Sequence, residues 1–258
     1  MTLDTGSIPV ENNSAPPRPL AELDARAPDT ASSHALGVRR MFDRISPTYD
    51  LLNRLLSLGI DRGWRKRALE VLAQRVPPGA LLDSCAGTLD LSAAMQERWP
   101  ERRLVAADFA RDMLVAGRAK LHGRGHALVC DAMRLPFASD SFAGMTCGFG
   151  MRNLADPRAG VAEAHRVLTY GGVFVVLEFF RPTRLPTRVF HAVYGRGLLP
   201  LVGRLVSGDG EAYGYLSRSM VGFLTRTEFE QALSDAGFRD VGGCDLTFGI
   251  ASLVWGVK

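Results

Sequence analysis

The sequence lacks the glycine-rich motifs that bind nucleotide phosphates. Neither Gly-x-Gly-x-x-Gly nor Gly-x-x-x-x-Gly-Lys-Ser/Thr occurs in its 258 residues. Proteins bind diphosphates through clustered backbone N–H groups and usually through a cation as well. The absence of both motifs argues against a nucleotide-dependent oxidoreductase and against other proteins that bind a diphosphate in this way.

Cysteine is sparse and scattered. No Cys-x-x-Cys pair occurs, and the four cysteines are Cys85, Cys130, Cys147 and Cys244. We therefore expect reduced, largely buried thiols in a cytoplasmic protein, with neither a disulfide framework nor a metal site. The net charge is only +4, and no run of Lys or Arg suggests a nucleic-acid groove.

Long apolar runs are also missing. No stretch approaches the roughly 18 uninterrupted apolar residues of a membrane-spanning helix, and no charged segment followed by an apolar one opens the chain. We expect neither a transmembrane helix nor a signal peptide. Residues 1–36 are rich in Pro, Ser, Asn and Ala, so we expect a disordered tail, because burial there cannot offset the entropy of ordering. Residues 37–258 then form one domain.

What the sequence does contain is an alternation of short apolar runs and amphipathic segments. Helical spacing over 37–75 predicts two helices, divided at Ser46-Pro47 because the residue before proline avoids helical dihedrals. Further helices are predicted near 90–98, 111–121, 156–168 and 226–236, with Asp156 and Thr225 as N-caps of the last two. Buried strands are predicted at 80–84, 103–107, 127–130, 143–147 and 173–178, and the extended runs 239–246 and 249–257 are expected to pair antiparallel. The fold class is α/β, a Rossmann-like, seven-stranded, doubly wound sheet with a C-terminal antiparallel hairpin.

Acidic residues lie at the ends of three predicted strands. Ligands of an open parallel sheet bind beyond the carboxyl ends of its strands, so these positions are candidate site residues. Asp108 is placed to accept both ribose hydroxyls of an adenosine, and Asp131 to accept a hydrogen bond from an adenine amino group. Acids without phosphate-binding glycines favour an adenosine that carries no phosphate, as in S-adenosylmethionine; the alternative is that each acid is a solvated strand cap. The predicted cofactor-binding residues are Asp83, Gly87, Thr88, Asp108, Phe109, Asp131, Ala132 and Gly148.

Five segments carry a family resemblance. They are MFDRISPTYDLLNRLLSLGIDRGWR at 41–65, DAMRLPF at 131–137, FGMRNLADP at 149–157, RVLTYGGVFVVLEFFRP at 166–182 and GDGEAYGYLSRSM at 208–220. From about residue 38 to the C-terminus the sequence resembles the ubiquinone/menaquinone-biosynthesis C-methyltransferases, within the class I S-adenosylmethionine-dependent methyltransferases. The resemblance implies cofactor contacts at Thr88, Asp108 and Asp131-Ala132. It also implies that Arg152 and Asn153 lie in a loop over the substrate side.

The resemblance implies a reaction as well, the transfer of a methyl group from S-adenosylmethionine to a ring carbon of a prenylated quinol. The acceptor is either demethylmenaquinol or the 2-polyprenyl-6-methoxy-1,4-benzoquinol of ubiquinone biosynthesis, and the sequence does not choose between them. Two alternatives stay open: a methyltransferase for another aromatic natural product, and a binding protein that kept the fold and lost the cofactor. Departures from the family pattern at Leu89, Gly148 and Val254 motivate the first of these alternatives.

Leu89 stands in the turn after the first strand, where the family has a glycine. If this position requires a positive φ, leucine costs about 1–2 kcal/mol. Its side chain could then enter the volume of the cofactor's methionine tail. If φ is negative, the side chain can turn into the core and cofactor binding survives.

Four residues are candidates for catalysis. Methyl transfer requires an acceptor carbon in line with the methyl group, exclusion of water, and electron density that rises when a ring hydroxyl loses its proton. Arg152 is predicted to stabilise the developing phenolate. Asp209, Tyr213 and Tyr215 are candidates for the general base or for positioning it. The alternatives are a structural ion pair for Arg152 and half-buried packing for the tyrosines.

Residues 179–208 carry five arginines and no acid. Apolar and basic side chains fall on opposite sides at helical spacing, interrupted at Pro200. One interpretation is a lid that covers a prenyl chain and touches an anionic membrane surface. The other is an amphipathic insertion packed on the sheet. The predicted partners are thus a prenylated quinol and, on the first interpretation, the inner face of a membrane.

Overall fold

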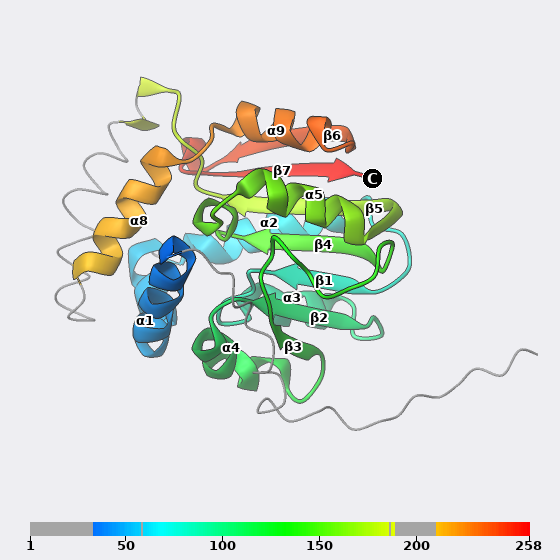
Figure 1. Cartoon of the computed structure of the whole chain (residues 1–258), viewed down its shortest axis with the longest axis horizontal. Coiled ribbons are helices and arrows are strands. Elements are labelled where there is room, and N and C mark those ends of the chain that lie inside the picture. The colour runs from blue at the N-terminus through cyan, green and yellow to red at the C-terminus, as the bar shows by residue number, and fades with distance from the viewer. Residues whose placement is uncertain (1–32, 58, 186, 189–209) are drawn as a thin grey trace, which may run out of the picture.

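A central sheet of seven strands organises the molecule (Figure 1). The computed structural model describes residues 33–57, 59–185, 187–188 and 210–258. The strands lie in the order β3-β2-β1-β4-β5-β7-β6. Their bounds are Leu81–Ser84 for β1, Leu104–Asp108 for β2, His126–Val129 for β3, Phe142–Gly148 for β4, Leu168–Glu178 for β5, Arg239–Leu246 for β6 and Ala251–Val257 for β7.

The direction of the strands confirms the predicted fold class. β7 pairs antiparallel with both β5 and β6, and the other neighbouring pairs are parallel. The order of the strands reverses between β1 and β4, which is the switch point where doubly wound sheets bind ligands. Ser84 at the end of β1 lies opposite Ala107 of β2 and Cys147 of β4, so the three strands end at one edge.

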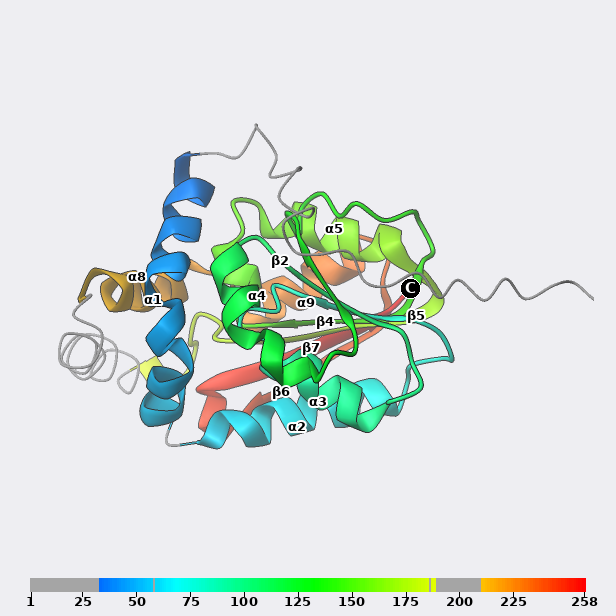
Figure 2. The same ribbon diagram turned by 90° about the horizontal axis from the view of Figure 1, so that it is seen from below.

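Helices cover both faces of the sheet and its carboxyl edge. The larger helices are α1 (Ser33–Ser57), α2 (Ile60–Ala73), α3 (Asp90–Arg98), α4 (Arg111–Gly117), α5 (Pro157–Val167), α8 (Gly210–Gly222) and α9 (Arg226–Asp235). Short 3-10 helices are η2 (Arg118–Leu121), η3 (Met151–Asn153) and η5 (Thr247–Gly249). α2 and α3 pack on one face, α5 and α9 on the other (Figure 2). α1 and α8 stand beyond the carboxyl ends of the parallel strands in both views.

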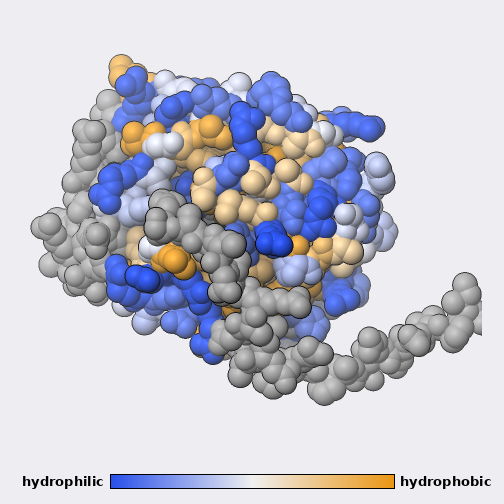
Figure 3. All heavy atoms as spheres, in the orientation of Figure 1, coloured by the Kyte–Doolittle hydropathy of each residue, from blue (hydrophilic) through white to orange (hydrophobic). Residues whose placement is uncertain are grey.

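Two large apolar clusters form the core on either side of the sheet. The central strands β4 and β5 are buried on both faces, which explains their near-continuous apolar sequences. Phe174 and Phe229 are fully buried on the side of α5 and α9, and Leu72 on the side of α2. On the face seen in Figure 3, hydrophobic and hydrophilic side chains are intermingled.

The predicted helix starts at Asp156 and Thr225 are confirmed. The Asp156 carboxylate accepts a hydrogen bond from the backbone N–H of Arg158 at 2.9 Å. Thr225 and Glu228 form the reciprocal capping box, since each side chain accepts from the backbone N–H of the other. These contacts fix where α5 and α9 begin.

The predicted division at Ser46-Pro47 is wrong. α1 runs unbroken through Pro47. Proline cannot donate a hydrogen bond to the carbonyl four residues earlier, which is that of Asp43. The Ser46 hydroxyl donates to this carbonyl oxygen instead, at 3.0 Å. A side chain thus supplies the partner that the proline removes, and one long helix results.

Candidate active site

An open cavity lies at the carboxyl edge of the sheet, between the strand ends and α1. It has a volume of about 810 Å³ with its mouth included. Six of the eight predicted cofactor residues line it: Gly87, Asp108, Phe109, Asp131, Ala132 and Gly148. α1 supplies a wall that the sequence analysis did not foresee, formed by Val38, Arg39, Phe42 and Tyr49.

Asp108 ends β2 and lines this cavity. Its Oδ2 accepts a hydrogen bond from the backbone N–H of Gly87 at 2.8 Å, and its Oδ1 from that of Ala110 at 2.7 Å. Burial raises the pKa of Asp108 to about 6 against the lowering effect of these two bonds, and the charge of Asp43 on α1 adds to the rise. The carboxylate is thus fixed in direction and retains lone pairs for a ligand.

Asp131 follows β3 in the wall of the same cavity. Its Oδ1 accepts a hydrogen bond from the backbone N–H of Met133 at 2.8 Å, a local turn that orients the carboxylate. Ala132 and Met133 line the cavity beside it. The structure therefore brings the two acids predicted for ribose and adenine into one cavity.

Asp83 and Thr88 lie behind the cavity wall rather than in it. Asp83 is fully buried and accepts hydrogen bonds from the hydroxyls of Ser92 at 2.5 Å and Thr146 at 2.8 Å. Burial raises its pKa to about 6, and the charge of Asp108 contributes to the rise. The Thr88 hydroxyl donates to Asp50 of α1 at 2.5 Å. Both residues support the turn between β1 and α3, and their predicted cofactor contacts stay predictions.

Leu89 has both the positive φ of one alternative and the core-facing side chain of the other. Its backbone is left-handed, with φ of 67° and ψ of 19°. Its side chain is nevertheless completely buried in an apolar cluster with Ala106, Leu114, Leu121 and Val129. The expectation that core packing requires a negative φ is wrong, because at this turn the left-handed backbone itself directs the side chain into the core.

The turns around the cavity contain residues other than glycine in the left-handed backbone conformation. Besides Leu89, Cys85 and Phe149 adopt positive φ values of 54° and 58° although neither is a glycine. Gly150 cannot be replaced, because a Cβ atom there would lie 2.2 Å from the Cβ of Cys85. Non-glycine residues in this conformation cost free energy and tend to cluster at functional sites. The turns after β1 and β4 are therefore tightly fitted to each other.

The second half of the edge, at β4 and β5, contains a buried ion pair. Arg152 Nη1 contacts Glu178 Oε1 at 2.5 Å, and the exposed fractions of the two side chains are 5% and 0%. Arg152 also donates to the carbonyl oxygen of Phe149 at 2.7 Å, and its guanidinium lies over the Phe179 ring at 5.6 Å. Glu178 accepts a further hydrogen bond from the backbone N–H of Phe179 at 2.7 Å. Glu178 is not among the predicted site residues, although it shares with Asp108 the signal of an acid at the end of an apolar strand.

Tyr215 of α8 reaches the loop that carries Arg152. Its hydroxyl donates to the side-chain oxygen of Asn153 at 3.3 Å, and Asn153 lines the cavity. Burial raises the pKa of Tyr215, against the effect of the nearby Arg152 charge, and Glu178 adds to the rise. Asp209 and the side chain of Tyr213 lie outside the described residues, as does most of the segment 179–208.

Three aromatic rings pack together beside the ion pair. Phe149 and Phe179 stack with ring centroids 4.6 Å apart, and Trp64 of α2 packs against both at 6.2 and 5.9 Å. Trp64 is fixed by a hydrogen bond from its Nε1 to the hydroxyl of Thr247 at 2.8 Å. The cavity wall therefore contains both carboxylates, from Asp108 and Asp131, and an aromatic ring, from Phe149.

The described part of the chain contains no group of three or more His, Cys, Asp and Glu side chains placed to hold a metal ion. All four cysteines are free thiols; Cys130 and Cys147 are buried, and Cys85 and Cys244 are half-buried. No helix within the described ranges has both the length and the apolar character needed to cross a membrane.

Comparison with known sequences identifies the family. The model of the ubiE/COQ5 methyltransferase family matches residues 29–258. The chain belongs to this family. It is 42% identical to the demethylmenaquinone methyltransferase of Deinococcus radiodurans, with 86% of this chain and 92% of that protein covered. It is 40% identical to the ubiquinone/menaquinone biosynthesis C-methyltransferase UbiE of Syntrophotalea carbinolica, over 85% and 93% of the two chains.

Solved structures show the same fold at low sequence identity. A SAM-dependent methyltransferase from Thermotoga maritima superposes with a TM-score of 0.61 at 17% identity, covering 86% of this chain and 99% of that one. The [4+2]-cyclase SpnF superposes with a TM-score of 0.60 at 14% identity, covering 88% and 96%. Since one neighbour is named for a cyclisation, the fold alone does not define the reaction, and the family membership carries that information.

Proposed function

We propose that the chain transfers a methyl group from S-adenosylmethionine to a ring carbon of a prenylated quinol. When bound, this cofactor supplies an electrophilic methyl group on a positively charged sulfur. The composition of the cavity wall supports it: Asp108 and Asp131 lie at adjacent strand ends beside a glycine turn. Among the described residues, the wall contains one guanidinium, Arg39, which pairs with Asp43 at 3.7 Å. A wall with carboxylates and no free cation of this kind suits an adenosine with a sulfonium better than a polyphosphate.

Each cavity residue has a role in this proposal. Asp108 would accept hydrogen bonds from the ribose hydroxyls, since a carboxylate has about four acceptor positions and backbone N–H groups do not use all of them. Asp131 would accept from the adenine amino group. Gly87, with φ of 53°, lets the backbone approach the ligand closely. Asp83 and Thr88 would act from behind, by fixing the turn.

The acceptor would lie toward β4 and β5. The names of the relatives support a quinol, and the Phe149 ring, which lines the cavity and packs against Phe179 and Trp64, offers an apolar surface for an aromatic head group. Arg152 would stabilise a developing phenolate from a fixed position, because Glu178 holds its guanidinium. Tyr215 and Asn153 would position the ring oxygen or accept its proton, and Asp209 and Tyr213 stay candidates for the same task.

Complementation tests the proposal directly. The chain is expressed in a bacterium that lacks its own quinone C-methyltransferase, and the extracted quinones are analysed by mass spectrometry. The expected result is the methylated quinone from the wild-type chain and none from Asp108→Ala. Accumulation of only the unmethylated precursor, with the wild-type chain present and folded, would overturn the proposal. Which precursor disappears also distinguishes the two head groups.

Peripheral contact of a cytoplasmic protein with the inner face of a membrane follows from a lipid-embedded substrate. Near the carboxyl edge, Leu185 and Phe248 are exposed at 70% and 91%. The two segments are joined by a hydrogen bond from the Thr187 hydroxyl to the carbonyl oxygen of Phe248 at 2.9 Å. Arg184, exposed at 72% and 3.8 Å from Asp245, adds a basic group that suits an anionic surface. We expect Phe248→Ser to reduce co-sedimentation with anionic vesicles severalfold; unchanged sedimentation would contradict contact at this point.

A further inference from the structure

α1 forms one wall of the cavity, so its position determines whether the cavity is closed. Val38, Arg39, Phe42 and Tyr49 all face the cavity from this helix. In Figures 1 and 2, α1 stands at the margin of the domain rather than against a face of the sheet. What fastens α1 to the domain therefore bears on how the cavity holds a ligand.

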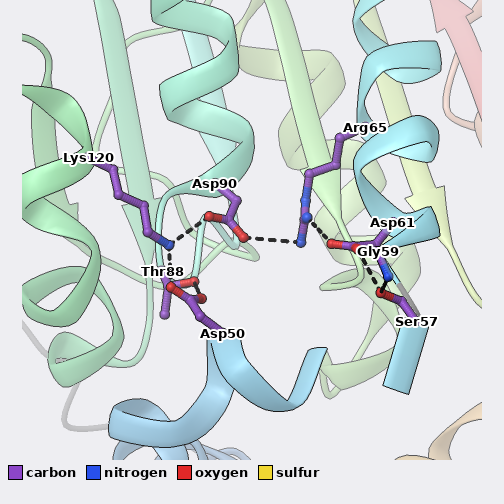
Figure 4. Close-up of polar contacts among 8 residues, drawn as sticks. All are labelled: Asp50, Ser57, Gly59, Asp61, Arg65, Thr88, Asp90 and Lys120. Atoms are coloured by element: carbon purple, nitrogen blue, oxygen red, sulfur yellow. Dashed lines mark hydrogen bonds and ion pairs between the residues drawn. The ribbon is translucent and has the colours of Figure 1, made fainter. Parts of the chain in front are cut away.

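The carboxylate of Asp50 binds the second half of α1 to the domain. Asp50 Oδ1 accepts a hydrogen bond from the Thr88 hydroxyl at 2.5 Å, and Asp50 Oδ2 accepts one from Lys120 Nζ at 2.5 Å (Figure 4). Lys120 also donates to Asp90 Oδ1, the first residue of α3, at 2.6 Å. We call these four residues, Asp50, Thr88, Lys120 and Asp90, the Asp50 cluster. They join α1, the β1–α3 turn and η2 at one point.

The cluster touches the ligand-binding turn directly. Thr88 follows Gly87, whose backbone N–H donates to Asp108 at 2.8 Å. Thr88 is 4% exposed, so its hydroxyl depends on Asp50 as a hydrogen-bond acceptor. A displacement of α1 would therefore leave a buried hydroxyl without its partner and release the turn next to Asp108.

A second set of contacts continues from Asp90 to the end of α1. Asp90 Oδ2 pairs with Arg65 at 3.5 Å, and Arg65 forms an ion pair with Asp61 of α2. The Ser57 hydroxyl at the end of α1 donates to Asp61 Oδ1 at 2.6 Å (Figure 4). α1 is thus joined to the same network at two places, about two turns apart along the helix.

We propose that Asp50 is a positioning residue that holds α1 closed over the cofactor by binding Thr88 and Lys120 together. The proposal rests on the proposed function, because it takes the cavity to be the S-adenosylmethionine site. Asp50 touches no reacting atom, and it acts through α1 and the β1–α3 turn. The ion pair is partly exposed, with exposed fractions of 25% for Lys120 and 33% for Asp50, so it contributes little to overall stability. The ion pair instead stabilises the closed position of α1.

The charge state of Asp50 agrees with this role. Burial works to raise the pKa of Asp50, but the hydrogen bonds from Lys120 and Thr88 outweigh it and hold the pKa below its usual value. The carboxylate therefore stays charged under physiological conditions. Salt is then the natural means of weakening the contact in the native protein.

The test uses the full chain with S-adenosylhomocysteine as the probe. Asp50→Asn keeps the shape of the side chain and removes its charge, and Lys120→Met removes the same ion pair from the other side. Asp235→Asn is the matched control. It breaks an exposed ion pair in which Asp235 lies 3.2 Å from Arg158, and neither residue lines the cavity. Dissociation rates are measured by stopped flow, and KM and kcat are measured with a quinol acceptor.

We expect Asp50→Asn and Lys120→Met each to accelerate dissociation of the probe about tenfold, as the loss of a charged hydrogen bond at a partly exposed site implies. KM for the cofactor should rise by a similar factor, kcat at saturating cofactor should change less than twofold, and the control should match wild type. Hydrogen–deuterium exchange without ligand should increase in residues 38–50 of both cluster variants. Folded variants with wild-type dissociation and exchange would overturn the proposal. A wild-type chain that does not bind the probe would overturn the proposed function instead, and the exchange experiment would still report on α1.

Discussion

Asp108 and Glu178 each place a carboxylate at the carboxyl end of a parallel strand, yet their surroundings differ. The hydrogen bonds of Asp108 come from the backbone N–H groups of Gly87 and Ala110, and the residue lines the cavity. Glu178 is fully buried, and the Arg152 guanidinium and backbone N–H groups use its oxygens. One acid is prepared for an outside partner, and the other already has its partner inside the protein.

The comparison shows that an acid at a strand end indicates a ligand site only together with its partners. Backbone donors orient Asp108 without neutralising it, so a ligand can still gain from its charge. In the Arg152–Glu178 pair, the charge of the carboxylate is already matched by a guanidinium inside the protein. The carboxylate at the end of β2 therefore keeps its charge available to a ligand, while the ends of β4 and β5 are fixed by the buried ion pair beside the stacked rings of Phe149 and Phe179.

The largest loss of stability is expected from breaking the buried Arg152–Glu178 ion pair. Glu178→Gln leaves the buried guanidinium of Arg152 without a counter-charge and should lower the free energy of unfolding by about 3–5 kcal/mol. Urea denaturation followed by circular dichroism measures this change. Glu70→Gln is the control, because Glu70 pairs with Arg67 on the surface and should cost less than about 1 kcal/mol. Equal stability losses in the two variants would contradict the distinction.

A double variant separates stability from catalysis in the same pair. Arg152→Met with Glu178→Leu replaces both charges by apolar groups of similar size, which is often neutral for stability. We expect a folded protein that still binds S-adenosylhomocysteine but has lost most of its methyl transfer. Activity near the wild-type level would show that Arg152 has only a structural role.

Leu89 tests the turn on the cofactor side. Leu89→Ala empties a fully buried position and should cost about 2–5 kcal/mol of stability. Leu89→Gly should be less harmful than alanine by about 1 kcal/mol, because glycine relieves the strain of φ at 67°. Neither variant should bind the cofactor more tightly. Tighter binding by Leu89→Gly would mean that the leucine enters the ligand volume.

The buried carboxylate of Asp83 should make the free energy of unfolding depend on pH. The pKa of Asp83 rises from 3.8 to about 6 on folding, so between these values the native state binds more protons than the unfolded state. The free energy of unfolding therefore falls as pH rises through this window, by up to about 3 kcal/mol for this group. Asp83→Asn should show a shallower fall in urea titrations between pH 4 and 7. A parallel curve would contradict the assignment.

Local sequence was enough for most of the fold and for the cavity acids. Strand–helix alternation and the caps at Asp156 and Thr225 depend on neighbouring residues, and the structure confirms both. The cavity acids follow from topology, because parallel strands bring their ends together. Pro47 was mispredicted because the compensating Ser46 hydroxyl is a side-chain effect that the proline rule does not contain.

Long-range contacts account for what the sequence did not reveal. Asp50 and Lys120 are 70 residues apart, and nothing near either residue indicates the other. Thr88 was assigned to the cofactor by resemblance, whereas its hydroxyl contacts α1. Glu178 could have been found by applying the strand-end argument to the fifth strand. Its buried ion pair with Arg152 could not have been predicted, because that contact depends on how the loop after β4 folds back.

Calorimetric titration with S-adenosylhomocysteine tests the central claim, that the carboxylate of Asp108 binds the cofactor. Wild type should bind at pH 8 and should lose affinity as the pH falls below about 6, where Asp108 becomes protonated. Asp108→Asn should bind about 10- to 100-fold more weakly at pH 8, with little further change at low pH. Asp140→Asn, which alters an exposed carboxylate paired with Lys258, should behave like wild type. Wild-type affinity in Asp108→Asn at both pH values would contradict the account.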